Sequence, residues 1–295
     1  MSAAVSLASI PVGTTRAPAR RNIVPILLTA PLILYMLVFY AFPVVAMLLR
    51  SLNSPHWSLD NYQQLAHDPV FFQVFWITLR TALIVTAGTL LLGYPVALAL
   101  ARLRRGSAAL VLVLVLLPFW TSVLVRSYAW MVLLGRHGLI NEALAAADLI
   151  DAPLKLLNTS FAVQTAMIHI LLPYMILPIA SVLRQIDPAL PRAAVGLGAP
   201  PFRVFRQVIL PLSMPGVAAG VLLVFVLSLG FYITPMLVGG PRDMLLSMLI
   251  AQQVDLINWP YAACLSATLL AATLVMLAVF QRLPGVRNVL RTATR

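Results

Sequence analysis

Charged residues are scarce in this 295-residue chain, at 9% of the sequence, whereas hydrophobic residues make up 61%. Soluble domains carry about 25% charged residues. A soluble protein of this composition could not cover its surface with polar groups, so lipid must be its solvent. The shortage of charge therefore excludes an ordinary soluble fold and predicts an all-α, polytopic membrane protein.

Residue patterns for catalysis and metal binding are also lacking. The single cysteine, Cys264, lies in an apolar run and cannot form an internal disulfide. No glycine-rich phosphate loop of the Walker type occurs in the sequence. The four histidines show no metal-ligand spacing; they are His56, His67, His137 and His169. We therefore expect no catalytic residue, no bound cofactor and no metal in this chain.

Basic residues outnumber acidic ones, 20 to 8, which gives a formal net charge of +12. A nucleic-acid-binding protein would gather such residues on one polar face. Here the basic residues fall in short clusters between apolar runs, a pattern typical of membrane topology. The charge therefore predicts contact with membrane lipid and no nucleic-acid partner.

Six apolar stretches reach the roughly 20 residues that a membrane span needs. They are residues 23–49, 77–101, 108–134, 161–183, 217–237 and 261–280. The first exceeds a secretory h-region and ends at Arg50 without a small-residue cleavage site, so we interpret it as an uncleaved span. Prolines inside the spans predict kinks at Pro118, Pro173, Pro178 and Pro235. The predicted organisation is a tail (1–22), a transmembrane domain (23–282) and a second tail (283–295).

Basic residues are distributed unequally between the two sides of these spans. Fourteen of the 20 lie on the side that holds both tails, the turn at 102–107 and the segment at 184–216. Basic residues are enriched in cytoplasmic loops. The asymmetry therefore predicts that both termini are cytoplasmic.

The segment at 184–216 has a helix–turn–helix pattern. Small residues at Ala193 and Ala194 suit a short helix that ends at Gly198 in a left-handed conformation. Pro200 and Pro201 then suit the start of a second helix. That helix has an apolar side and a basic side, formed by Val204, Phe205, Val208 and Ile209 and by Arg203 and Arg206. We expect both helices to lie on the cytoplasmic membrane surface, and a simple amphipathic connector is the alternative.

This segment resembles the coupling motif of ABC importer permeases, in which Glu-Ala-Ala and Gly precede Leu-Pro and Pro-Gly. Matching positions are Ala193, Ala194, Gly198, Leu210, Pro211, Pro215 and Gly216. The resemblance implies an ATPase-coupling site that also includes Ala199 and Phe205. Arg192 stands where the family has glutamate. A contact that the negative charge of that glutamate makes with an ATPase therefore cannot form here with the same sign of charge.

Further blocks are similar to permeases of the spermidine/putrescine type. They lie at residues 118–122, 126–130, 138–141 and 232–243. The resemblance implies the type I ABC importer permease fold in a bacterial inner membrane. It also implies a second permease subunit, ABC ATPase subunits that bind ATP, and an extracytoplasmic solute-binding protein. The chain would form half of a pathway for a small organic solute, such as a polyamine.

Aromatic residues are the candidates for contact with such a cationic solute, because ring faces attract ammonium groups. They are Tyr232, Trp120, Tyr128 and Trp130, and the alternative is that they anchor the chain at the membrane interface. No carboxylate lies deep in a span, which leaves span ends such as Asp243 for charge pairing. We interpret Arg80 and Arg126 as snorkelling residues near external span ends.

Two other function classes make different demands on the sequence. A stand-alone secondary transporter or channel would favour ionisable residues inside its spans, and the sequence places none at mid-depth. A membrane-embedded enzyme would need His, Asp or Glu clustered near one membrane face, and no such cluster is evident. The permease interpretation therefore stands first.

Overall fold

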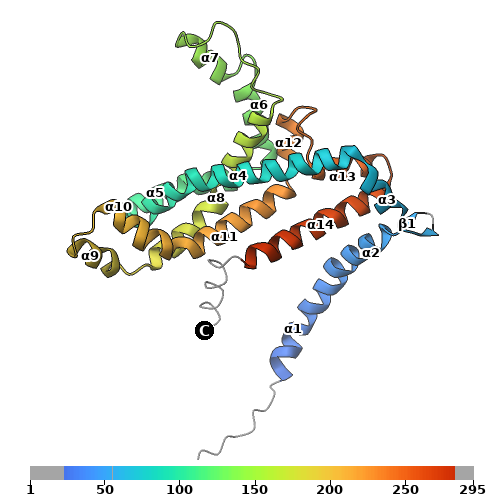
Figure 1. Cartoon of the computed structure of the whole chain (residues 1–295), viewed down its shortest axis with the longest axis horizontal. Coiled ribbons are helices and arrows are strands. Elements are labelled where there is room, and N and C mark those ends of the chain that lie inside the picture. Colours follow the sequence, from blue (N-terminus) through green and yellow to red (C-terminus); the bar gives the residue numbers. More distant parts are fainter. Residues whose placement is uncertain (1–22, 55, 283–295) are drawn as a thin grey trace, which may run out of the picture. The chain divides into compact units, whose positions relative to one another are not determined.

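The computed structural model describes residues 23–54 and 56–282, and the predicted tails at 1–22 and 283–295 lie outside the described residues. Helices form nearly all of the described chain (Figure 1). The chain divides into two units, one ending at Met47 and the other beginning at Leu48.

The described part of the first unit belongs to a single apolar helix with one wide turn, which ends three residues into the second unit. Helix α1 (Ile23–Met36) continues through the π-helical turn η1 (Leu37–Ala41) into α2 (Phe42–Arg50). The Phe42 N–H bonds to the carbonyl of Leu37, just before Pro43, which has no N–H to donate to the preceding turn. The stretch Thr29–Arg50 is long and apolar enough to cross a membrane.

Helix α8 (Ser160–Gln185) is the centre of the second unit and packs against α4 (Pro69–Arg102) and α11 (Leu210–Leu229). Its fully buried side chains include Met167, Leu171, Met175, Ile176 and Ile179. Pro173 and Pro178 lie inside α8 without dividing it. Helix α14 (Trp259–Arg282) packs against α11 and completes the long helices of this unit (Figure 1).

Two glycines let α11 approach the backbone of α8. A Cβ atom at Gly216 would lie 2.8 Å from the carbonyl oxygen of Pro178, and one at Gly220 would lie 2.9 Å from the sulfur of Met175. Small residues four apart are a common means of bringing membrane helices together. The pair therefore fixes the spacing of α8 and α11.

The predicted span at 108–134 is wrong as a single helix. Helix α5 (Arg105–Trp120) and helix α6 (Val123–Leu134) meet at a bend of 97°. Thr121 is extended, with ψ of 148°, and the Ser122 side chain caps α6 by accepting from Leu124 N–H at 3.3 Å. Pro118, a predicted kink site, lies one turn before the break.

Five stretches of the described chain are individually long and apolar enough to cross a membrane, and the bent pair α5–α6 would make a sixth span. The five are Thr29–Arg50, Pro69–Arg102, Ser160–Gln185, Pro201–Leu229 and Trp259–Phe280. The predicted all-α, polytopic fold is thereby confirmed, with one of its spans broken.

The second helix predicted for the membrane surface is continuous with the long helix that follows it. Helix α10 (Pro201–Val204) continues through the π-helical turn η2 (Phe205–Ile209) into α11, as one stretch from Pro201 to Leu229. The Leu210 N–H bonds to the carbonyl of Phe205, and this wider turn keeps the helix continuous ahead of Pro211. The helix thus begins before the predicted span at 217–237 and stops within it, at Leu229.

Shorter elements lie between the long helices. They are β1 (Asn53–Ser54), β2 (His56–Trp57), α3 (Asp60–His67), α7 (Leu139–Ala146), α9 (Ala189–Gly196), α12 (Ile233–Val238) and α13 (Leu246–Asp255). Strands β1 and β2 pair antiparallel. The Leu246 N–H donates to Thr78 Oγ1 at 2.8 Å, and Tyr261 donates to Asp68 at 2.9 Å. These bonds tie α13 and α14 to the beginning of α4.

Candidate functional site

The end of α9 has the left-handed turn that the sequence predicts. Gly198 has φ of +84°. Its N–H donates to the carbonyl of Val195 at 2.9 Å, and the Ala199 N–H donates to the carbonyl of Ala194 at 3.1 Å. This pair of bonds is the Schellman arrangement that closes a helix at a left-handed glycine. The turn therefore places α9 at a defined angle to the helix that starts at Pro201.

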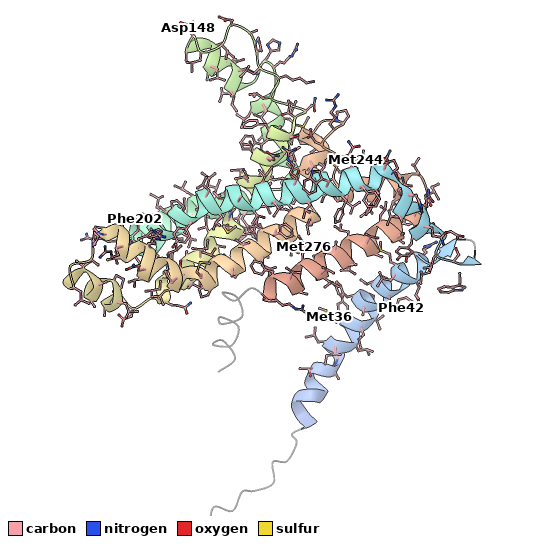
Figure 2. The ribbon with its side chains drawn as sticks, viewed as in Figure 1. Met36, Phe42, Asp148, Phe202, Met244 and Met276 are labelled. Atoms are coloured by element: carbon pink, nitrogen blue, oxygen red, sulfur yellow. The ribbon has the colours of Figure 1, made fainter. Side chains whose placement is uncertain are left out.

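Helix α9 exposes an apolar surface. No residue of this helix is buried, and Leu190 and Val195 are both exposed. Leu197, at the turn, is 89% exposed. Phe202 is also exposed, and Figure 2 places it at the end of the bundle that carries α9 and α10. A run of exposed large apolar side chains on one short segment is typical of a surface that another protein covers.

Arg192 remains on this surface as an exposed cation. Its Nε donates to the carbonyl of Pro188 within the same helix, at 3.0 Å. No carboxylate pairs with it among the described residues. The charge of Arg192 is therefore available to a partner.

The structure separates the predicted coupling residues into two groups. Ala193, Ala194, Gly198 and Ala199 lie with Arg192 at α9 and its turn, where they are exposed or half-buried. The second group lies along η2 and α11; it comprises Phe205, Leu210, Pro211, Pro215 and Gly216. Phe205 packs edge-on against Tyr94 at 5.9 Å, and Gly216 is buried against α8. Phe205 and Gly216 thus contribute to helix packing, whereas α9 offers the free surface.

The four predicted pathway aromatics do not form one cluster. Trp120 ends α5 and is 85% exposed, while Tyr128 and Trp130 lie on α6, exposed and half-buried respectively. Tyr232 lies half-buried between α11 and α12. Helix α12 packs against α6, and its Thr234 hydroxyl lies 2.9 Å from that of Ser127. The segment after Tyr232 is therefore held against α6.

Helix α8 adds residues that sequence reasoning missed. Trp130 Nε1 donates to His169 Nδ1 at 3.3 Å, and the two rings meet edge-on with centroids 5.6 Å apart. Phe119 and Tyr174 pack with ring centroids 5.7 Å apart. The aromatics of α5 and α6 therefore meet α8 on both sides of the 97° bend. The sequence offered one signal for this contact: His169 is a polar residue within a predicted apolar span.

Arg126 is half-buried on α6. It interacts electrostatically with His169 and Tyr174, which lie well inside the 26-residue helix α8. Its Nε is buried and has no hydrogen-bond partner within the described ranges. Arg126 therefore lies beside α8 as a half-buried residue with one nitrogen shielded from solvent. The cause is the bend, which directs α6 against α8.

Asp243 is committed to a structural role. It is buried; its carboxylate accepts from the Ser160 hydroxyl and, at 3.1 Å, from the Gly240 N–H. These bonds tie the loop after α12 to the beginning of α8. We expected Asp243 as a possible partner of a cationic solute, but its oxygens are occupied by the chain itself.

Two kinds of sequence comparison agree on the family of this protein. The profile of the binding-protein-dependent transport system inner membrane component family matches residues 89–287. The spermidine/putrescine transport system permease protein PotB of Escherichia coli K12 is 38% identical over 233 residues, covering 79% of this chain and 84% of that protein. Its Haemophilus influenzae counterpart is 36% identical over 245 residues, covering 83% and 81%.

Solved structures share the fold. A bacterial ABC transporter for import of the acidic polysaccharide alginate matches with a TM-score of 0.69 at 18% identity, covering 90% of this chain and 97% of that one. The same kind of transporter, in complex with an alginate pentasaccharide-bound periplasmic protein, matches with a TM-score of 0.71 at 18% identity, covering 89% and 95%. The chain therefore belongs to the family of binding-protein-dependent transport system inner membrane components, as a multi-pass permease subunit of an ABC importer.

Proposed function

We propose that this permease forms half of the import pathway for a polyamine or a related small organic solute. The observation that carries the solute class is the 36–38% identity to spermidine/putrescine permeases over about four fifths of the chain. A second permease subunit would supply the other half of the pathway. An extracytoplasmic solute-binding protein would deliver the solute, and ABC ATPase subunits would bind and hydrolyse ATP.

Coupling to the ATPases would occur at α9. Its exposed surface around Leu197 suits a groove on another protein, and the rigid turn at Gly198 would carry a displacement of α9 into the helix that follows. ATP binding and a loaded binding protein would then both favour the outward-facing state of a two-state bundle. Hydrolysis would return the bundle to the inward-facing state.

Two exposed aromatics and the half-buried Tyr232 are the proposed contacts of the solute. Trp120, Tyr128 and Tyr232 could offer ring faces to ammonium groups. Arg126 carries a like charge beside His169 and would repel an ammonium group that approached that side of α6. We therefore place the solute on the side of α6 that carries Tyr128, away from Arg126.

The test is reconstitution of this chain into proteoliposomes with the ATPase, second permease and binding protein of the same system. We expect uptake of labelled putrescine or spermidine that requires ATP and the binding protein, and no ATP hydrolysis by this chain alone. Uptake of only an unrelated solute would contradict the polyamine proposal and leave the family assignment intact. Uptake by this chain without the ATPase would instead support a stand-alone transporter or channel.

A further inference from the structure

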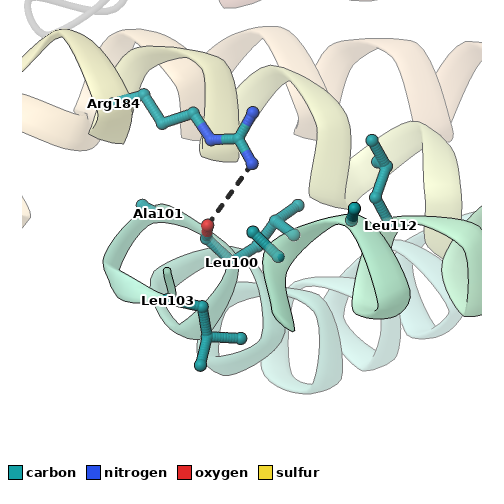
Figure 3. A pocket seen from close by; sticks show the side chains of 7 residues that line it. Leu100, Ala101, Leu103, Leu112 and Arg184 are labelled. Atoms are coloured by element: carbon teal, nitrogen blue, oxygen red, sulfur yellow. Dashed lines mark hydrogen bonds between the residues drawn. The ribbon is translucent and has the colours of Figure 1, made fainter. Parts of the chain in front are cut away.

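A pocket of about 380 Å³ lies where three helices of the bundle end or begin (Figure 3). The end of α4, the first half of α5 and the last turn of α8 form its walls. Its lining is Leu100, Ala101, Leu103, Ala108, Ala109, Leu112 and Arg184. One cation therefore stands among six apolar side chains, and no residue assigned to coupling or to the solute pathway takes part.

The guanidinium of Arg184 is only lightly engaged. Its one hydrogen bond within the described chain runs from Nη2 to the carbonyl of Leu100, at a long 3.4 Å (Figure 3). The nearest acid in sequence, Asp187, accepts from the Ala189 N–H at 2.8 Å and forms no ion pair with Arg184. A guanidinium has five N–H donors. Most donors of Arg184 are therefore free for an anion.

Neighbouring groups add positive potential. Arg102 and Arg104 are exposed on the turn between α4 and α5. Arg104 is also the N-cap of α5, and it provides no side-chain cap to the free N–H groups of that helix. The beginning of a helix carries partial positive charge. The turn and the helix start thus favour an anion in the same place as Arg184.

The apolar walls indicate what kind of anion fits. Leu103 lines the pocket just after the end of α4 and is exposed. A soluble anion would gain nothing from such leucines, whereas an acyl chain would be covered by them. Basic pockets between membrane helices are known to hold anionic lipid headgroups. We propose that this pocket binds an anionic phospholipid, with the phosphate on Arg184 and an acyl chain along Leu103 and Leu112.

The experiment is native mass spectrometry of the purified transporter complex with phosphatidylglycerol or phosphatidylcholine added at equal concentration. We expect tighter retention of phosphatidylglycerol, and a loss of about fivefold in its affinity for Arg184→Gln. Ala109→Phe should cause a similar loss, because it fills the pocket without removing a charge. Arg242→Gln, which changes an exposed arginine on the loop after α12, is the matched control and should retain the lipid.

Three outcomes would overturn the proposal. Unchanged phosphatidylglycerol retention in Arg184→Gln and Ala109→Phe would show that lipid binds elsewhere. Displacement of the lipid by millimolar inorganic phosphate alone would show a site for a soluble anion. Loss of the ATPase from Arg184→Gln, with lipid retained, would show that the arginine pairs with the partner protein.

Discussion

Gly198 offers the sharpest test of the coupling surface, because a substitution there can strain the backbone without causing a steric clash. Its φ of +84° lies in the left-handed region, and a Cβ added there would meet no atom of the chain within 4 Å. Gly198→Ala would therefore introduce strain without a clash. That strain is about 1–2 kcal/mol, which shifts the population of the native turn by roughly 5–30-fold.

Gly196 provides a matched control two residues earlier. It ends α9, has no positive φ and also has open space around its Cβ position. Gly196→Ala should be neutral or slightly favourable, since alanine is the better helix former. We expect Gly198→Ala to lower solute-stimulated ATP hydrolysis in proteoliposomes several-fold, and Gly196→Ala to leave it near the wild-type value.

Gly198→Asp extends the test to the contact itself. It adds bulk and negative charge as well as strain, so the ATPase should co-purify less well than with Gly198→Ala. Membrane insertion should be normal for all three variants. The reasoning would be refuted if both Gly198 variants matched Gly196→Ala in hydrolysis and in ATPase recovery, because α9 would then be a simple connector.

Three further predictions concern packing, pathway and topology. Gly216→Ala should destabilise the bundle by about 1–3 kcal/mol, because its Cβ would lie 2.8 Å from the carbonyl oxygen of Pro178. Gly230→Ala is the control, since its Cβ would meet nothing within 4 Å, and its thermal unfolding midpoint should match the wild type. If Gly216→Ala also unfolded at the wild-type midpoint, the close packing of α11 on α8 would be contradicted. Tyr232→Ala should reduce uptake without loss of assembly, and unchanged uptake would make Tyr232 an ordinary packing residue. A reporter fused after residue 295 should be active only in its cytoplasmic form, and external activity would refute the predicted orientation.

Composition and local pattern predicted much of this fold. The scarcity of charge predicted the membrane class, and the small residues before Gly198 predicted a helix closed by a left-handed glycine. Both signals are local, so they need no knowledge of tertiary contacts. The sequence did not predict the break at Thr121. An apolar run indicates how long a span is, but it does not indicate where the helical hydrogen bonds are interrupted.

The contacts of the candidate pathway were less accessible to sequence reasoning. Trp130 and His169 are far apart in the chain, and only the 97° bend brings α6 against α8. The same bend brings Arg126 beside His169. The sequence also did not predict that one helix continues through Pro211, because a proline ordinarily suggests a helix start. In the structure, the wide turn before Pro211 accommodates it.

The uninterrupted helix from Pro201 to Leu229 has a mechanical consequence. At 1.5 Å per residue, its 29 residues form a rod of about 43 Å. The rod is clamped near its middle, where Gly216 and Gly220 meet α8. It can therefore act as a lever that pivots at this contact, so that a small swing at Pro201 would displace the other end, at Leu229, in the opposite direction. The wide turn at Phe205–Ile209 lies between Pro201 and the contact at Gly216. If this turn bent, the displacement at the far end of the helix would be smaller.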